Sequence, residues 1–262
     1  MFYLTACLIF KDAASYLEEW IRFHKQVGVE HFYLYDNDSE DDCESVIRRH
    51  VEQGNITLYK WPGVAQHDPV IQHCLDQHRT MSRWIAFLDD DEFLFPAKEN
   101  DSREVLSQYE PYAGVAVSWL LFGSNGHRTR PPGSVLENYR KRADWIDPHV
   151  KCVVDPSRVT SPSVSAHAFN CAAGETLVDE MKQPISGPFR EQPSADVLCL
   201  NHYLTKSHEE MIRRRTRLKV DGTKELRTIA EWEELDAQYK SVEDLRIQRF
   251  VKETTEFTPC AR

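Results

Sequence analysis

The sequence predicts an α/β fold with a mostly parallel sheet, followed by C-terminal helices. Four nearly continuous apolar runs, at residues 2–10, 29–35, 56–60 and 84–88, have the length and composition of buried strands. Between them lie three segments with helical spacing of apolar residues, at about 13–27, 41–53 and 70–78. Strands that alternate with helices through short connections favour parallel pairing with right-handed crossovers.

Local signals support the first helices of this pattern. Asp12 is predicted to cap the first helix, and Gly28 to end it. Ser39 with Asp42 resembles a capping box for the second helix, which Gly54 closes. The apolar start of the chain lacks the basic region and cleavage site of a signal peptide, so it is read as a strand.

The second part of the chain is less regular. A helix at 103–110 and a strand at 114–123 precede residues 124–196, which hold most of the prolines and are predicted to form long functional loops over the sheet. A late strand, a basic helix and two amphipathic helices follow, at 197–205, 207–220, 228–239 and 242–253. We therefore expect one domain over 1–220 and a helical extension over 221–262 packed on it.

Composition excludes several classes of protein. A net charge of −10 argues against a general nucleic-acid binder, because such proteins need a basic surface. No apolar run reaches the ~18 residues of a membrane span. The seven cysteines are scattered and form no CxxC pair, which favours reduced thiols over a disulfide framework and predicts a cytoplasmic protein.

An acidic cluster carries the strongest functional signal. Asp89, Asp90, Asp91 and Glu92 directly follow the fourth predicted strand and precede another apolar run. Mn²⁺ and Mg²⁺ prefer carboxylate, phosphate and water oxygens, and such an ion can neutralise a departing nucleoside diphosphate. If the segment is extended, Asp89 and Asp91 point to the same side. The alternatives are a solvated acidic turn and a phosphatase nucleophile, and Phe93 stands where the phosphatase motif wants Thr or Val.

A second acidic group follows the second strand, beginning at Asp36. Ligands of parallel sheets bind beyond the carboxyl ends of the strands, so a nucleotide or metal complex is expected between the two acidic groups. An EF-hand is rejected, because Asp41 stands in place of its glycine and Ile47 in place of its last glutamate. The alternative for this segment is a turn with a helix cap.

Basic groups near the carboxyl end of the chain are the last candidates. His202 follows an apolar strand and should lie at a sheet end, although a hydrogen-bonded core histidine remains an alternative. The basic run that includes Arg213, Arg214 and Arg217 suits a solvated helix face, diphosphate contact or an anionic membrane surface. His67, His73 and His78 lack the spacing of a zinc pair, and no GxGxxG or P-loop motif occurs.

Together these segments resemble glycosyltransferase family 92 and related bacterial family-2-like glycosyltransferases. The resemblance covers roughly residues 4–220 and rests on the following segments: Lys11-Asp12, YLEEWIRFHKQVGVEHFYLYDNDSEDD (16–42), WIAFLDDDEFLFP (84–96), WLLFGSNGH (119–127), HVKCVVDP (149–156) and NHYLTKS (201–207). It implies a GT-A-like fold, a nucleotide-sugar donor that is typically a UDP-sugar, and Mn²⁺ or Mg²⁺ bound at a DxD motif, here Asp89-Asp90-Asp91.

The same resemblance implies roles for single residues. Asp91 is the expected direct metal ligand, Asp89 a contact of the ribose or of metal-bound water, and His202 a further metal ligand. Asp36 is expected to hold the nucleoside of the donor. Lys206 is also expected to bind the donor, but this follows from its position after the late strand and before the basic helix and not from the resemblance. Inversion of configuration needs a general base, which the sequence does not identify. Its candidates are acidic residues of the loops: Glu175, Asp179 and Glu191.

The expected function is thus metal-dependent transfer of a sugar, with the protein acting as a hexosyltransferase on a glycan or glycolipid acceptor. The alternative is a catalytically inactive nucleotide-sugar-binding or scaffold protein with the same fold. Animal members of the family often carry an N-terminal membrane anchor, which this sequence lacks. We therefore expect a cytoplasmic location with peripheral contact to the inner face of the membrane through Arg213 and Arg217.

Overall fold

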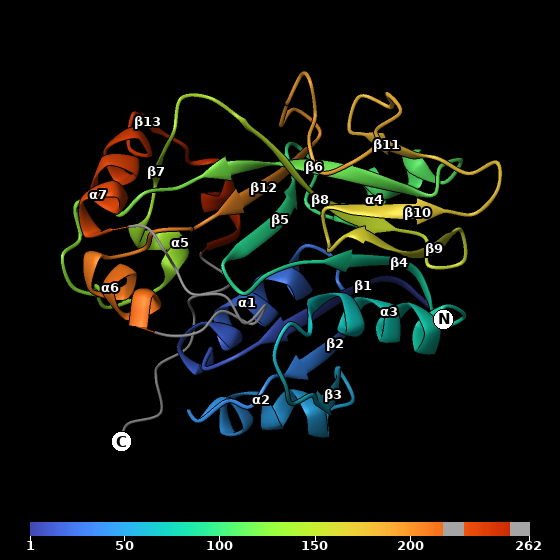
Figure 1. Ribbon diagram of the computed structural model, residues 1–262, viewed down its shortest axis with the longest axis horizontal. Helices are drawn as coiled ribbons and strands as arrows, with labels where there is room; N and C mark the ends of the chain where they lie inside the picture. Colours follow the sequence, from blue (N-terminus) through green and yellow to red (C-terminus); the bar gives the residue numbers. More distant parts are fainter. Residues whose placement is uncertain (217–227, 252–262) are drawn as a thin grey trace.

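This computed structural model describes residues 1–216 and 228–251. Its main feature is a nine-stranded sheet (Figure 1). Its order is β3-β2-β1-β4-β8-β6-β12-β5, and β11 also pairs with β6. The strands are β1 (Phe2–Phe10), β2 (His31–Asp36), β3 (Ile56–Lys60), β4 (Ser82–Phe87), β5 (Glu92–Pro96), β6 (Gly114–Leu121), β8 (Asp147–Val154), β11 (Leu177–Asp179) and β12 (Leu198–His202). Five of the eight pairings in this sheet are parallel, so the predicted α/β class with a mostly parallel sheet is confirmed.

The first four strands form the parallel half, with helices on both faces. Helices α1 (Ala14–Gln26) and α2 (Cys43–Glu52) pack on one face, where Trp20 and Ile47 join a core with Phe32 and Trp84. Helix α3 (His67–His78) covers the opposite face and packs on Tyr33 and Tyr35. Both faces are thus covered by apolar side chains, which explains why these strands read as continuous apolar runs.

The second half of the sheet mixes directions. Strand β8 lies between β4 and β6 and is antiparallel to both, and β5 pairs antiparallel with β12 at the far edge. The chain therefore leaves β4, makes the acidic turn and enters the opposite edge of the same curled sheet. Because β6 and β12 run parallel to each other and in the direction of β4, their carboxyl ends lie at the same edge as those of β1 and β2.

The prediction of long loops over 124–196 was wrong. This stretch holds the central strand β8 together with short elements: α5 (Val135–Asn138), β7 (Lys141–Arg142), β9 (Val159–Val164), β10 (Ala168–Cys171) and β11. The prolines that suggested loops include Pro148, near the start of β8, and Pro156, directly after Asp155. Prolines at strand ends do not remove a ladder hydrogen bond, so they do not exclude a strand between them.

Gly28 and Gly54 follow the ends of α1 and α2 as predicted, but both predicted N-terminal caps were wrong. Asp12 has a φ of +52°, and its side chain accepts a hydrogen bond from Glu40 N at 2.8 Å instead of capping α1. The Ser39 hydroxyl accepts from Asp12 N at 3.0 Å, so it does not form a capping box with Asp42. Asp41 accepts from Ala14 N at 2.9 Å. The loops after β1 and β2 therefore bond to each other, which fixes the edge of the sheet where ligands are expected.

The carboxyl-terminal elements pack against the sheet. Along the chain, α4 (Ser102–Leu106) and the 3-10 helix η1 (Ser107–Tyr109) connect β5 to β6. Helix α6 (His208–Thr216) is the described part of the predicted basic helix, and α7 (Ile229–Gln238) matches the next one. The predicted helix at 242–253 is instead a short strand, β13 (Val242–Glu243), and a 3-10 helix, η2 (Arg246–Phe250).

A buried carboxylate explains this last difference. Asp244 accepts hydrogen bonds from Arg142 Nε at 2.8 Å and from Arg246 N at 3.1 Å, which holds a turn where a helix would otherwise begin. Ile247 and Phe250 then enter the main core, and Asp236 of α7 accepts from the Ser124 hydroxyl at 2.6 Å. The division of the chain at residue 220 stays a prediction.

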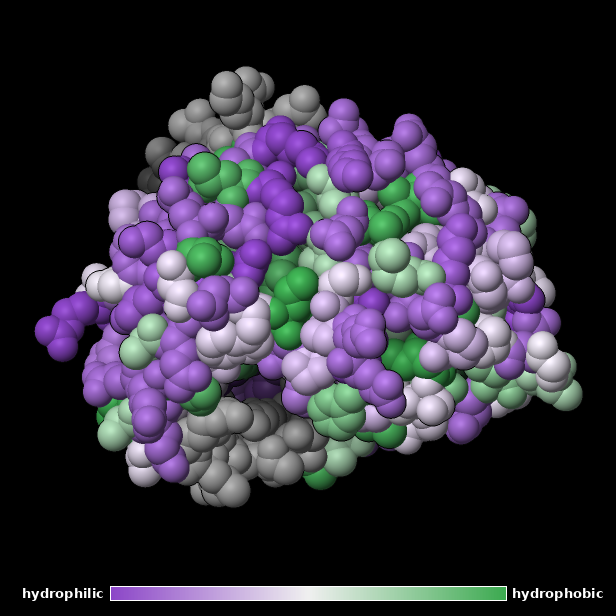
Figure 2. Space-filling model, turned by 90° about the horizontal axis from the view of Figure 1, so that it is seen from above, coloured by the Kyte–Doolittle hydropathy of each residue, from purple (hydrophilic) through white to green (hydrophobic). Residues whose placement is uncertain are grey.

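Two further observations concern the cysteines and the surface. The six cysteines in the described residues are free thiols, and Cys260 lies outside them. Within residues 1–216 and 228–251, no helix has the length and apolar character needed to span a membrane. Figure 2 shows one face of the molecule, on which hydrophobic residues are scattered among hydrophilic ones.

Candidate functional site

The acidic cluster forms a tight turn between β4 and β5. Glu92 N donates to Asp89 O at 3.2 Å, so the segment is not extended. As a result, Asp89 and Asp91 do not share a side as the alternation argument expected. Asp90 and Asp91 line a cavity of about 510 Å³, whereas Asp89 turns toward Lys151. The turn replaces the alternating pattern because β4 ends at Phe87, before the first carboxylate.

Asp91 is buried and lies between two cationic groups. Its carboxylate is 3.4 Å from His202 Nε2 and accepts a hydrogen bond from Arg214 Nη2 at 3.0 Å. Burial works to raise the pKa of Asp91, but the charges of His202 and Arg214 outweigh burial and hold that pKa well below its usual value. The Asp91 carbonyl also accepts from Tyr203 N at 2.8 Å, which ties the acidic turn to the end of β12.

Lys151 neutralises the other side of the turn. Its ammonium group, on β8, is only 3% exposed and lies 2.8 Å from Asp89 Oδ2 and 3.6 Å from Glu92 Oε2. Burial opposes ionisation of Asp89, yet Lys151 lowers the pKa of Asp89 to about 2. Glu92 is fully buried, and burial raises its pKa to about 7 against the opposing charge of Lys151.

Glu92 also links this turn to an aromatic side chain. Its carboxylate accepts hydrogen bonds from Asp89 N at 2.9 Å and from Trp119 Nε1 at 2.6 Å. Trp119 in turn lies against His202, with ring centroids 4.5 Å apart. The carboxylate of Glu92 therefore positions the turn, the indole and, through the indole, the histidine.

The acidic turn offers a partial metal site. Among the residues that the structure describes, no group of three or more His, Cys, Asp or Glu side chains is placed to hold a metal ion. Asp91 and His202 are the expected ligands that lie together, and Arg214 occupies an oxygen of Asp91. Two protein ligands fit an ion such as Mg²⁺ or Mn²⁺ that takes its other ligands from phosphate and water.

The cavity beside Asp90 and Asp91 is also lined by basic side chains. Lys206, Arg213 and Arg214 line it, from the segment that follows β12 and from α6. The Lys206 ammonium lies 3.9 Å from the centre of the Tyr16 ring, and its backbone has a φ of +49°. Arg213 is exposed and lies 3.7 Å from Glu209, while Arg217 falls outside the described residues. Membrane contact through these two arginines stays a prediction.

Asp36 lies two strands from the acidic turn, at the end of β2. It is buried, accepts from Ser39 N at 2.9 Å and pairs with Lys60 Nζ at 2.7 Å. Burial opposes ionisation, but the bonds from Lys60 and Ser39 lower the pKa of Asp36. Asp36 does not line the cavity, so in this structure it stabilises the turn after β2.

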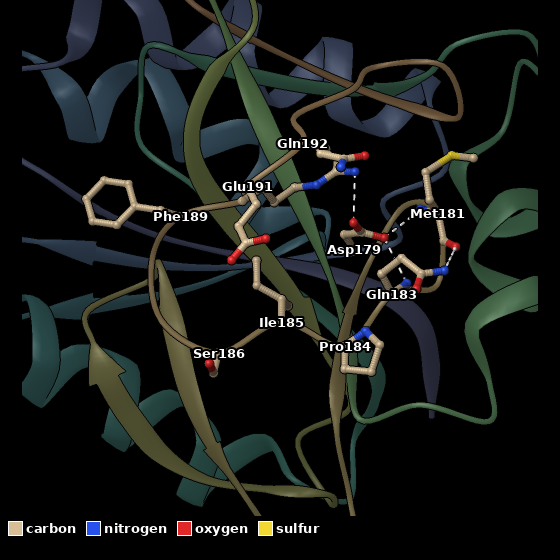
Figure 3. Close-up of a pocket in the computed structure, with 10 residues that line it drawn as sticks. Asp179, Met181, Gln183, Pro184, Ile185, Ser186, Phe189, Glu191 and Gln192 are labelled. Atoms are coloured by element: carbon tan, nitrogen blue, oxygen red, sulfur yellow. Dashed lines mark hydrogen bonds and ion pairs between the residues drawn. The ribbon is translucent and has the colours of Figure 1, made fainter.

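The three candidates for a general base lie away from the acidic turn. Glu175 forms an ion pair with Arg158, and Asp179 pairs with Arg190 at 2.9 Å. Asp179 and the exposed Glu191 line a second cavity, of about 490 Å³, which shares no lining residue with the first (Figure 3). None of the three contacts the acidic turn.

Sequence reasoning missed Lys151 and Trp119 as members of this site, and it named Glu92 only as part of the acidic cluster. The signal for Lys151 was available, because a lysine within the apolar strand HVKCVV must have a buried counter-charge. Asp89 and Glu92, which follow the predicted strand at 84–88, were the candidate counter-charges. Glu92 and Trp119 carried no such signal, since their contact depends on the pairing of β5, β12 and β6.

The chain is similar in sequence to known proteins. A family model described as "Glycosyltransferase family 92" matches residues 3–187. The family 92 protein RCOM_0530710 of Ricinus communis is 30% identical over 206 residues, which cover 76% of this chain and 35% of that protein. Galactan beta-1,4-galactosyltransferase GALS3 of Arabidopsis thaliana is 29% identical over 119 residues, covering 41% and 23%.

The chain spans about a third of the length of the curated family 92 relatives it matches. Among solved structures, S. aureus TarS 1-349 in complex with UDP-GlcNAc gives a TM-score of 0.42 at 10% identity, covering 96% of this chain and 71% of that one. At that score the likeness carries no argument about the site.

Proposed function

Because the chain belongs to glycosyltransferase family 92, we propose that it transfers a sugar from a nucleotide-sugar donor to a hydroxyl group of a glycan acceptor. One observation carries this proposal. A cavity of about 510 Å³ is lined by carboxylates, among them Asp90 and Asp91, and by the basic side chains of Lys206, Arg213 and Arg214. It lies at the carboxyl ends of the parallel strands, where ligands of such sheets bind.

The basic side chains that line this cavity suit the diphosphate of the donor. Arg214 and Lys206 can donate to phosphate oxygens, and guanidinium groups bind such oxygens with two parallel bonds. Arg214 contacts Asp91 in this structure, so the diphosphate would exchange that contact for its own. Fixed cations at the diphosphate also stabilise the charge that develops on it as the sugar leaves.

Asp91 and His202 would hold Mn²⁺ or Mg²⁺. Such an ion supplies positive charge that neutralises the diphosphate. Asp89 is 35% exposed and held by Lys151, which leaves one face of its carboxylate for the ribose or for metal-bound water. Asp36 remains the proposed contact of the nucleoside.

Inversion would require a base near the acceptor hydroxyl. Glu175 and Asp179 are both paired with arginines, and Glu191 lies in the second cavity, away from the acidic turn, so we propose none of the three as that base. The likeness to a galactan β-1,4-galactosyltransferase makes UDP-galactose and β-1,4-galactan the first pair to try.

The test measures release of nucleoside diphosphate from a panel of UDP- and GDP-sugars, with and without glycan acceptors. We expect release that depends on an acceptor and that Asp91→Asn abolishes. Asp76→Asn, at an exposed aspartate of α3, is the matched control. Nucleotide binding without release from any donor would support the catalytically inactive alternative. Absence of both binding and release would refute the proposal.

A further inference from the structure

A row of aromatic rings runs across the sheet from the acidic turn. His202 lies against Trp119, Trp119 stacks on His149, and His149 meets Phe189 edge-on, with ring centroids 4.5, 5.0 and 4.4 Å apart. Phe189 is 52% exposed, and the side chain of His149 is 42% exposed. The proposed donor chemistry uses none of Trp119, His149 and Phe189.

The outer end of this row is held firmly in place. Arg190 N donates to Pro148 O at 2.9 Å, and Val150 N donates to Pro188 O at 3.1 Å. These bonds attach the loop that carries Phe189 to β8 as an extra edge. The ring of Phe189 is therefore positioned by the sheet, although it stands on a loop.

The row leads to the second cavity, of about 490 Å³. Figure 3 shows Phe189 extending away from Asp179 and Gln183, with Glu191 and Ile185 between them. The wall holds neutral hydrogen-bonding groups, among them Gln183, Ser186 and Gln192. Arg190 is 3% exposed, and its Nε atom is buried without a hydrogen-bond partner although its terminal nitrogen pairs with Asp179.

We propose that the exposed rings of His149 and Phe189, together with this second cavity, bind the acceptor glycan. Aromatic faces pack against the apolar faces of sugar rings, and a few convergent polar groups fix the orientation of the hydroxyls. The row begins beside His202 and Asp91, so an acceptor bound on its exposed outer end can extend toward the donor site. The sugar units farther from the reaction lie on His149 and Phe189.

The charges of the cavity favour a neutral ligand. Asp179 and Glu191 stand on its wall, and Asp179 already neutralises Arg190. An anionic ligand would meet uncompensated carboxylate charge there. A chain of neutral sugars meets no such charge and can use the amide and hydroxyl groups, so the inferred acceptor is an uncharged oligosaccharide of several units.

This inference rests on the proposed transferase activity, and its test separates the two. The probes are β-linked galacto-, gluco- and xylo-oligosaccharides, from the monosaccharide to the pentasaccharide. Direct binding is measured by saturation-transfer NMR, and acceptor KM by transfer from the active donor. We expect affinity to rise with chain length in the wild type.

The variants change one ring and keep the rest of the site. Phe189→Leu keeps an apolar side chain but removes the flat face, and should raise KM for long acceptors about two- to tenfold while kcat and donor KM stay unchanged. Phe189→Tyr keeps the ring and should retain wild-type values. Leu245→Ala, at a residue 49% exposed and outside the row, is the matched control.

Each outcome addresses one claim. Glycan binding that Phe189→Leu weakens, with no transfer from any donor, would refute the transferase but support the glycan site. Transfer with the same KM and chain-length dependence in wild type and Phe189→Leu would overturn the glycan site but leave the transferase. Failure of every oligosaccharide to bind the wild type would also overturn the glycan site.

Discussion

Replacing Lys151 with methionine tests whether the acidic turn depends on a buried counter-charge. The ammonium group lies 2.8 Å from Asp89 and 3.6 Å from Glu92, and it is 3% exposed. Removing one partner of a buried ion pair costs about 3–5 kcal/mol. Asp89 is 35% exposed, so water recovers part of that loss, and we expect the free energy of unfolding to fall by about 3 kcal/mol.

The assay is urea and thermal unfolding near neutral pH. A loss of that size corresponds to a fall of about 6–12 °C in Tm for a chain of this length. Lys98→Met, at an exposed lysine, should change stability by less than about 0.5 kcal/mol. The double variant Lys151→Met/Glu92→Gln should recover part of the loss, because it removes one of the two carboxylates left without a counter-charge.

The pH dependence gives a second measurement. In the wild type, Lys151 holds the pKa of Asp89 at about 2 against an ordinary value of 3.8, so this contribution is present above pH 3.8 and lost as pH falls toward 2. Without Lys151, burial raises the folded pKa of Asp89 and Glu92 above their unfolded values. The folded state then binds more protons than the unfolded state, and stability falls as pH rises. The deficit of Lys151→Met should therefore be larger at about pH 8 than at about pH 5.

Two results would refute this reasoning. The first is a loss below about 1 kcal/mol, which would mean that the carboxylates are solvated without Lys151. The second is a deficit of equal size at both pH values, which would point to lost packing of the lysine stem instead of lost charge.

Four further predictions concern the proposed reaction. EDTA should abolish transfer and Mn²⁺ should restore it, and full activity in EDTA would contradict a metal held by Asp91 and His202. Asp91→Asn should lower kcat by at least about 100-fold. Asp90→Asn should lower kcat/KM by about tenfold because Asp90 lines the same cavity, and wild-type kinetics would place Asp90 outside the donor site. Asp36→Asn keeps an oxygen for the turn and should raise donor KM with little change in Tm, and an unchanged KM would leave Asp36 as a turn-stabilising residue.

The sequence alone was sufficient to predict the strands whose boundaries are set by apolar runs. The strands at 2–10 and 56–60 were predicted to the residue, because their apolar runs have clear ends. His202 was correctly placed at a sheet end for the same reason. Predictions that depended on a single side-chain bond did worse. Asp12 and Ser39 bond to each other's loops, and no local pattern distinguishes that arrangement from a cap.

In the candidate site, too, the sequence did not predict which side chains bond to one another. The four carboxylates were found as a group, but their directions follow from the turn between Asp89 and Glu92, and their partners come from β8 and α6. Lys151 and Arg214 are more than 60 residues away in the chain, at separations of 62 and 123. Such contacts are set by tertiary packing, which periodicity and spacing do not report.

The place of β8 between β4 and β6 constrains how this protein can be re-engineered. An exchange of residues 124–196 with those of a relative would also replace a central strand and the lysine that supports the acidic turn. A chimaera should instead keep Asp147–Val154 and replace only the segment that follows it, up to the start of β12. Exchange of that segment alone would leave the acidic turn and its counter-charge unchanged, and would test whether the segment sets the proposed acceptor preference.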